Sequence, residues 1–128
     1  MTVKTYSLKK NGNEKLSANF RVREFACKDG SDKILIDSDL VELLQKIRTH
    51  FEKPIKINSG YRTESHNKKV GGTKNSYHLK GQASDIQVVG IHPILVAMYC
   101  EKLNAGGIGV YSNFIHVDTR TKKYRWID

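Results

Sequence analysis

The chain has 128 residues, of which 38% are hydrophobic and 27% are charged. This composition excludes a disordered chain, and the length suffices for one domain with a hydrophobic core. Lysine and arginine number 22 against 13 for aspartate and glutamate, a formal net charge of +9. Such a charge indicates a polyanionic partner, which could be nucleic acid, an anionic cell-wall polymer or a membrane surface.

Cysteines and apolar runs give expectations about the cell compartment. Cys27 and Cys100 do not make a disulfide framework, and we expect two free, mostly buried thiols in a reducing compartment. The first eight residues lack the apolar segment of a secretory signal peptide. The longest apolar run, Ile94–Met98, is far shorter than a membrane span. We therefore expect synthesis in the cytoplasm without a signal peptide, and no membrane insertion.

The most regular predicted helix covers residues 40–51 and follows an apolar run at residues 34–36. Its apolar residues recur at the spacing of one helical face. Asp37 or Ser38 is the expected N-cap, and Pro54 is expected to end the helix.

The remaining predicted elements are short and alternate between strands, helices and loops. They are a strand at 55–57, a helix at 63–70, a loop at 71–82, a strand at 83–89, a helix at 94–104 and a hairpin at 108–118 with its turn at 112–113. No internal repeat or linker interrupts this order. We therefore predict one α+β domain over residues 1–128, with a small antiparallel sheet and flanking helices, and with residues 1–16 as a candidate flexible segment.

Three side chains in the second half of the chain form a candidate metal site. His78 lies at the end of a glycine-containing loop, and Asp85 follows seven residues later at the start of an apolar strand. The small Gly81 between them lets the backbone turn back. His116 lies in the hairpin opposite Gly109, where a glycine would leave room for a metal and a substrate. The His78–Asp85 spacing also occurs by chance, but His116 in an apolar strand favours zinc, which binds imidazole and carboxylate.

Several motifs then occur in a characteristic order. They are Ser59-Gly60-Tyr61-Arg62-Thr63, His66-Asn67, Val70-Gly71-Gly72, Ser76-x-His78-x-x-Gly81-x-Ala83-x-Asp85 and Ile115-His116-Val117-Asp118. Over roughly residues 17–126 the chain resembles the zinc D-alanyl-D-alanine carboxypeptidases and peptidoglycan endopeptidases of peptidase family M15, whose fold is related to the hedgehog signalling domain. The stretch from Asn19 to Asp32 resembles the small phage and prophage branch of that family.

The resemblance implies roles for individual residues. The zinc ligands would be His78, Asp85 and His116. Arg62 would bind substrate and stabilise the developing oxyanion, a role that suits an always-charged, forked guanidinium. Ser76 would bind substrate or support the neighbouring ligand.

The general base is the point at which this chain departs from the family. Several branches have a glutamate or aspartate three residues before the last ligand, where this chain has Asn113, and others have a histidine where it has Phe114. Asp118 is the carboxylate nearest to His116 in the sequence. It would either act catalytically, by taking a proton from the bound water, or only orient His116. His66 is a weaker candidate base.

The resemblance implies a zinc-dependent metallopeptidase that hydrolyses a peptide bond in peptidoglycan stem peptides or cross-links. We expect a monomeric, phage- or prophage-type endolysin that acts on the cell wall after release or is carried in a virion, and whose charge draws it to anionic wall polymers. One alternative is a non-catalytic, zinc-containing wall-binding or structural module. We do not expect a specific nucleic-acid binder, because that hypothesis depends on charge alone and the sequence shows no recognition-helix pattern.

Overall fold

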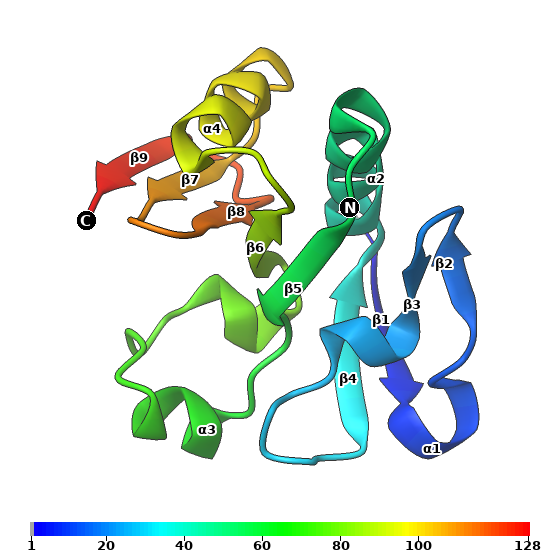
Figure 1. The fold of residues 1–128 in the computed structure, drawn as a ribbon. Helices are drawn as coiled ribbons and strands as arrows, with labels where there is room; N and C mark the ends of the chain where they lie inside the picture. Colours follow the sequence, from blue (N-terminus) through cyan, green and yellow to red (C-terminus); the bar gives the residue numbers. More distant parts are fainter. Residues whose placement is uncertain (1) are drawn as a thin grey trace.

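The computed structural model describes residues 2–128 and places them in an α+β fold, as predicted (Figure 1). The N-terminal part contains β1 (Val3–Ser7), α1 (Leu8–Asn11), β2 (Lys15–Ser17), β3 (Phe20–Arg21), the 3-10 helix η1 (Val22–Phe25), β4 (Lys33–Asp37) and α2 (Ser38–Phe51). The C-terminal part contains β5 (Ile55–Ser59), α3 (Glu64–Lys69), the 3-10 helix η2 (Tyr77–Lys80), β6 (Ala83–Val88), α4 (Pro93–Lys102), β7 (Gly107–Val110), β8 (Ile115–Asp118) and β9 (Tyr124–Ile127).

The N-terminal segment that was a candidate for flexibility forms secondary structure. β1 pairs antiparallel with β4, in register from Val3 opposite Asp37 to Ser7 opposite Lys33. Tyr6, Leu8 and Leu16 pack against the hydrophobic core. These few apolar residues are widely spaced in a polar, basic sequence, so their periodicity is too weak to predict the strands.

Helix α2 confirms the most regular sequence prediction. It begins at Ser38, and the Asp37 carboxylate caps it by accepting a hydrogen bond from the Asp39 amide at 3.0 Å. It ends before Glu52, which adopts a left-handed conformation with φ of 53° two residues ahead of Pro54. The buried face of the helix consists of Leu40, Val41, Leu44 and Ile47.

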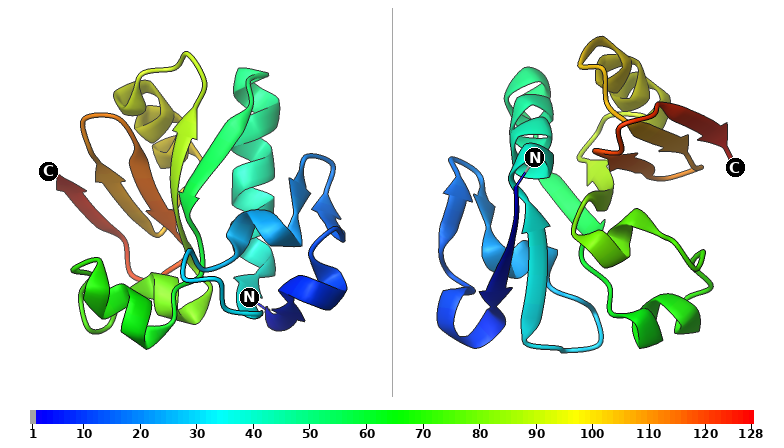
Figure 2. Two further views of the ribbon diagram at one scale, coloured as in Figure 1. Left: turned by 60° about the horizontal axis from the view of Figure 1, so that its bottom comes forward. Right: turned by 180° about the vertical axis from the view of Figure 1, so that it is seen from behind.

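The larger sheet has the strand order β5-β6-β8-β7-β9. All neighbours are antiparallel except β7 and β9, which are parallel. Strand β9 lies in the basic, aromatic tail, and its addition makes the sheet mixed rather than purely antiparallel. Helices α2 and α4 contact each other and pack on one face of the sheet (Figures 1 and 2).

Alternation along the central strands separates the core from the opposite face of the sheet. Ile86, Ile115 and Val117 belong to the hydrophobic core. Asp85 and His116 alternate with these residues, and therefore point to the face that α2 and α4 leave open. Among residues 2–128, no helix is long and apolar enough to cross a bilayer.

Candidate functional site

The fold brings together the three side chains that were predicted to bind a metal. Asp85 of β6 and His116 of β8 are direct cross-strand partners. His78, buried in η2, approaches the same carboxylate. Asp85 Oδ1 lies 3.3 Å from His78 Nε2 and 3.1 Å from His116 Nδ1. The three ligand atoms all lie within 4.8 Å of one another.

Local structure directs each imidazole towards Asp85. Ser76 caps η2, accepting a hydrogen bond from the His78 amide at 3.2 Å, and Gly81 ends it in a left-handed conformation with φ of 71°. Gly81 therefore provides the predicted turn between His78 and the strand that carries Asp85. The His78 ring donates from Nδ1 to the Gly60 carbonyl at 2.7 Å, which leaves Nε2 as the nitrogen that faces the site.

On the other side, His116 Nε2 lies 2.7 Å from Asp118 Oδ2. A carboxylate only accepts hydrogen bonds, so Nε2 carries the proton and Nδ1 faces Asp85. Burial opposes charge on His116, but its hydrogen bonds to Asp118 and Asp85 raise its pKa overall. Burial likewise opposes charge on Asp85, and hydrogen bonds from His116 and His78 nevertheless lower the pKa of that carboxyl.

The orientations of these three side chains are those that a metal ion requires. Two ring nitrogens and one carboxylate oxygen, all electron-pair donors, converge on one point. The rear of each ring is fixed by a hydrogen-bond acceptor, the arrangement that holds metal-binding histidines in place. A divalent cation would displace the proton that otherwise bridges His116 and Asp85. The residues therefore fit zinc, which accepts two imidazoles and a carboxylate in its catalytic sites.

Arg62 lies directly beside this cluster, as the resemblance implied. Its Nη2 donates to Asp85 Oδ2 at 3.2 Å, Nη1 donates to Asn67 Oδ1 at 3.1 Å and Nε donates to Ser59 Oγ at 2.9 Å. The side chain is 14% exposed. Three hydrogen bonds thus fix the guanidinium while part of it still faces the cavity next to the site.

Asp118 lies behind His116 rather than in the cavity. The residue is 0% exposed, and its carboxylate accepts hydrogen bonds from the Gly107 amide at 2.7 Å and from Arg120 Nη2 at 2.6 Å as well as from His116. Burial opposes its ionisation, but the bonds from His116 and Arg120 lower its pKa. Asp118 is thus held as an anion whose two oxygens are already occupied.

The cluster opens into a cavity of about 470 Å³. Arg62, Ser76 and the three candidate ligands contribute to its lining, and Asp118 does not. An aromatic and cationic wall, which was not predicted from the sequence, completes the cavity: Tyr77, Tyr111, Arg120, Tyr124 and Trp126. The basic, aromatic tail at residues 120–126 was a sequence signal for Arg120, Tyr124 and Trp126, but not for Tyr77 and Tyr111.

Gly109 corrects part of the sequence prediction. Its predicted pairing with His116 is confirmed by the register of β7 and β8. The space beside it, however, is filled by the Trp126 ring, which a Cβ on Gly109 would strike. Trp126 Nε1 donates to the Tyr111 hydroxyl at 3.0 Å. The glycine therefore makes room for an aromatic wall of the cavity, rather than for the metal and substrate themselves.

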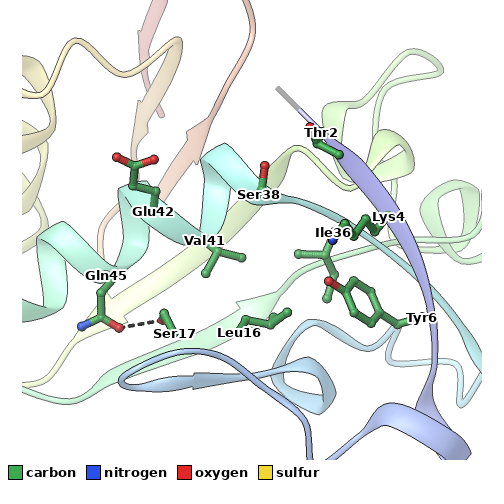
Figure 3. A pocket seen from close by; sticks show the side chains of 10 residues that line it. All are labelled: Thr2, Lys4, Tyr6, Leu16, Ser17, Ile36, Ser38, Val41, Glu42 and Gln45. Atoms are coloured by element: carbon green, nitrogen blue, oxygen red, sulfur yellow. Dashed lines mark hydrogen bonds between the residues drawn. The ribbon is translucent and has the colours of Figure 1, made fainter.

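The weaker base candidate, His66, and Asn113, which stands where several branches have the base, both lie outside this cavity. Asn113 lines a separate cavity next to β6 and α4. His66 lies in α3, close to Cys27 and Asp29. A further cavity of about 390 Å³ lies between β1, β2 and α2 and contains none of the predicted site residues (Figure 3).

Comparison with known proteins identifies the family of this chain. Residues 16–118 match the family model described as Peptidase M15. The chain is 39% identical over 94 residues to a probable peptidoglycan L,D-endopeptidase, MepK, of Haemophilus influenzae, a match that covers 66% of this chain and 50% of the relative. It is 37% identical over 93 residues to the peptidoglycan L,D-endopeptidase MepK of Escherichia coli K12, covering 66% of this chain and 51% of the relative.

The chain spans about half the length of these curated relatives. The family model, in contrast, covers most of the chain, including all three candidate ligands, Arg62 and Asp118. The chain therefore belongs to the Peptidase M15 family.

Proposed function

We propose that this chain is a zinc-dependent peptidase that hydrolyses a peptide bond in bacterial peptidoglycan. The observation that carries the proposal is the convergence of His78, Asp85 and His116 on one point beside a fixed arginine, at the base of an open cavity. The names of the relatives support peptidoglycan as the substrate and favour an endopeptidase over a carboxypeptidase. An endolysin role in a phage or prophage is supported by the resemblance of residues 19–32 alone.

His78, Asp85 and His116 would hold the zinc ion, which supplies a Lewis acid and lowers the pKa of bound water. Arg62 would bind the carbonyl oxygen of the scissile bond, because its guanidinium is fixed in place and always charged. Negative charge grows on that oxygen during the reaction, so a cation held in advance lowers the barrier. Ser76 would keep His78 in place through the cap of η2.

Asp118 would act through His116 and would not touch the substrate. Its oxygens accept hydrogen bonds from three groups, and it lies outside the lining of the cavity. A carboxylate in this position fixes the tautomer of the histidine and makes its other nitrogen a stronger ligand. Of the two roles left open by the sequence, we therefore propose the orienting one.

The test is mass spectrometry of purified peptidoglycan after incubation with the zinc-loaded protein. We expect new peptide fragments with free amino groups, whose masses identify the bond that is cut. His78→Ala and chelation of the wild type should both abolish them. His50→Gln is the matched control, because His50 stacks on Tyr99 in a different part of the molecule. Unchanged fragment release by His78→Ala would overturn the proposal.

One observation favours a non-catalytic alternative, a zinc-containing wall-binding module. Among the described residues that line the cavity, Asp85 is the only carboxylate, and it is a candidate ligand rather than a base. The same experiment separates the two functions. A binding module would sediment with cell walls and release no fragments, whereas a peptidase would release them.

A further inference from the structure

A second group of metal-binding side chains lies outside the site described above. Cys27, Asp29 and His66 offer a thiol sulfur, a carboxylate oxygen and an imidazole nitrogen, all within 4.8 Å of one another. Cys27 is buried and follows η1, Asp29 lies in the loop before β4, and the partly buried His66 belongs to α3. Two segments distant in sequence thus meet at this cluster.

Hydrogen bonds around Thr63 hold the cluster in shape. The Thr63 hydroxyl donates to Asp29 Oδ2 at 2.8 Å and accepts from the His66 amide at 3.2 Å as the N-cap of α3. It also lies 4.0 Å from Cys27 Sγ. Asp29 Oδ1 accepts from the amide and the hydroxyl of Ser31, which fixes the carboxylate from its other side. These contacts fix the Asp29 carboxylate and the backbone of His66 on one hydroxyl, which also lies next to the Cys27 thiol.

The chemistry of these donors selects among metals. Thiolate and imidazole nitrogen are ligands of zinc and similar transition metals, whereas magnesium and calcium prefer oxygen ligands throughout. A thiolate and a carboxylate together balance a divalent charge, which suits a partly buried position. Three such ligands leave one tetrahedral position, which a water molecule can fill.

We propose that Cys27, Asp29 and His66 form a second zinc site. It would tie the loop before β4 to the start of α3. That helix carries Asn67, which accepts a hydrogen bond from Arg62 and donates to the Thr73 carbonyl at 2.8 Å. A metal ion here would therefore stabilise the segment that positions Arg62. The site itself does not depend on the proposed peptidase function.

Cobalt substitution tests the site by a signal other than activity. Thiolate bound to Co²⁺ gives an intense charge-transfer band in the near ultraviolet, and the first site contains no sulfur. We expect the cobalt-loaded protein to show this band and to take up a second metal equivalent. Cys27→Ser should lose both, while Cys100→Ser should keep both, because Cys100 is the other buried cysteine and lies outside the cluster. Absence of the band in the wild type, or its persistence in Cys27→Ser, would overturn the proposal.

Two further variants test the site independently, in case Cys27→Ser does not fold. Asp29→Asn and His66→Gln change residues that are exposed and partly buried, respectively, and leave the thiol in place. Each should weaken cobalt binding at this site by about tenfold or more while the circular dichroism spectrum is unchanged. Unchanged affinity in both would also contradict the proposal. His78→Ala should leave the band intact, so failure of the first site and failure of the second are separable.

Discussion

Asp118 accepts hydrogen bonds from His116, Arg120 and the Gly107 amide, and these contacts are the basis of the orienting role proposed for it. Burial opposes its ionisation, but the hydrogen bonds from His116 and Arg120 lower its pKa, which keeps it an anion throughout the neutral range. An anion that is fully buried and fully bonded is suited to orient a histidine. A general base, in contrast, must reach the proton that it removes.

Asp118→Asn separates these two roles. If Asp118 orients His116, the variant should bind zinc about 10–100-fold more weakly, as measured by competition with a chromophoric chelator, and excess zinc should restore much of the activity. If Asp118 is the base, zinc affinity should stay close to that of the wild type and activity should be lost at every zinc concentration. Asp32→Asn is the matched control, since Asp32 pairs with Ser7 far from the site in sequence.

At the residue level, sequence reasoning identified those side chains whose spacing repeats a known motif. His78, Asp85, His116 and Arg62 were all predicted, and all lie together. Arg120 was not assigned a role. Its hydrogen bonds to Asp118 join residues only two apart, but its position over the Tyr77 ring, 4.4 Å from the ring centroid, depends on tertiary packing that no local pattern encodes.

At the level of elements, predictability followed the strength of local periodicity. Helix α2 has a cap, an apolar face and a following proline, and it was predicted nearly to the residue. Strand β9 was missed because its four residues form too short a pattern, and because it gains its hydrogen bonds from β7 in a parallel pairing. The β1–β4 pair was missed for a related reason, since it joins segments that lie far apart along the chain.

Gly109→Ala tests the packing of β7 against β9. The added methyl group would strike the Trp126 ring, so we expect a loss of about 1–3 kcal/mol in the free energy of unfolding, measured by chemical denaturation. Trp126 is the only tryptophan, and its fluorescence emission should shift as the ring moves towards solvent. Ser112→Ala, in the exposed turn of the same hairpin, should change neither quantity.

A double variant checks the cause of this loss. Trp126→Leu removes the ring that the new methyl group would strike, so combining it with Gly109→Ala should cost less stability than the sum of the two single changes. Strict additivity would show that the methyl group acts through something other than Trp126. Because the double variant lacks the fluorophore, its unfolding would be followed by circular dichroism.

For the whole molecule, the net charge of +9 is the feature that would govern encounter with the proposed polyanionic cell wall. The proposed metal ligands and Arg62 would account for chemistry at one cavity, but of these residues only Arg62 is among the 22 lysines and arginines. Charge spread over a surface acts at long range and attracts a polyanion before any specific contact forms. This attraction should be sensitive to salt, because the Debye length falls from about 10 Å at 0.1 M to about 3 Å at 1 M.

We therefore expect sedimentation of the protein with purified cell walls to fall steeply as salt is raised from about 0.05 M to about 0.5 M, because screening removes the long-range attraction. Walls stripped of their anionic polymers should bind less protein at low salt. Cleavage of a small, uncharged peptide substrate should depend much less on salt, since it needs only the cavity. Wall binding that is equally tight at both salt concentrations would show that a specific contact, and not the net charge, holds the protein on its substrate.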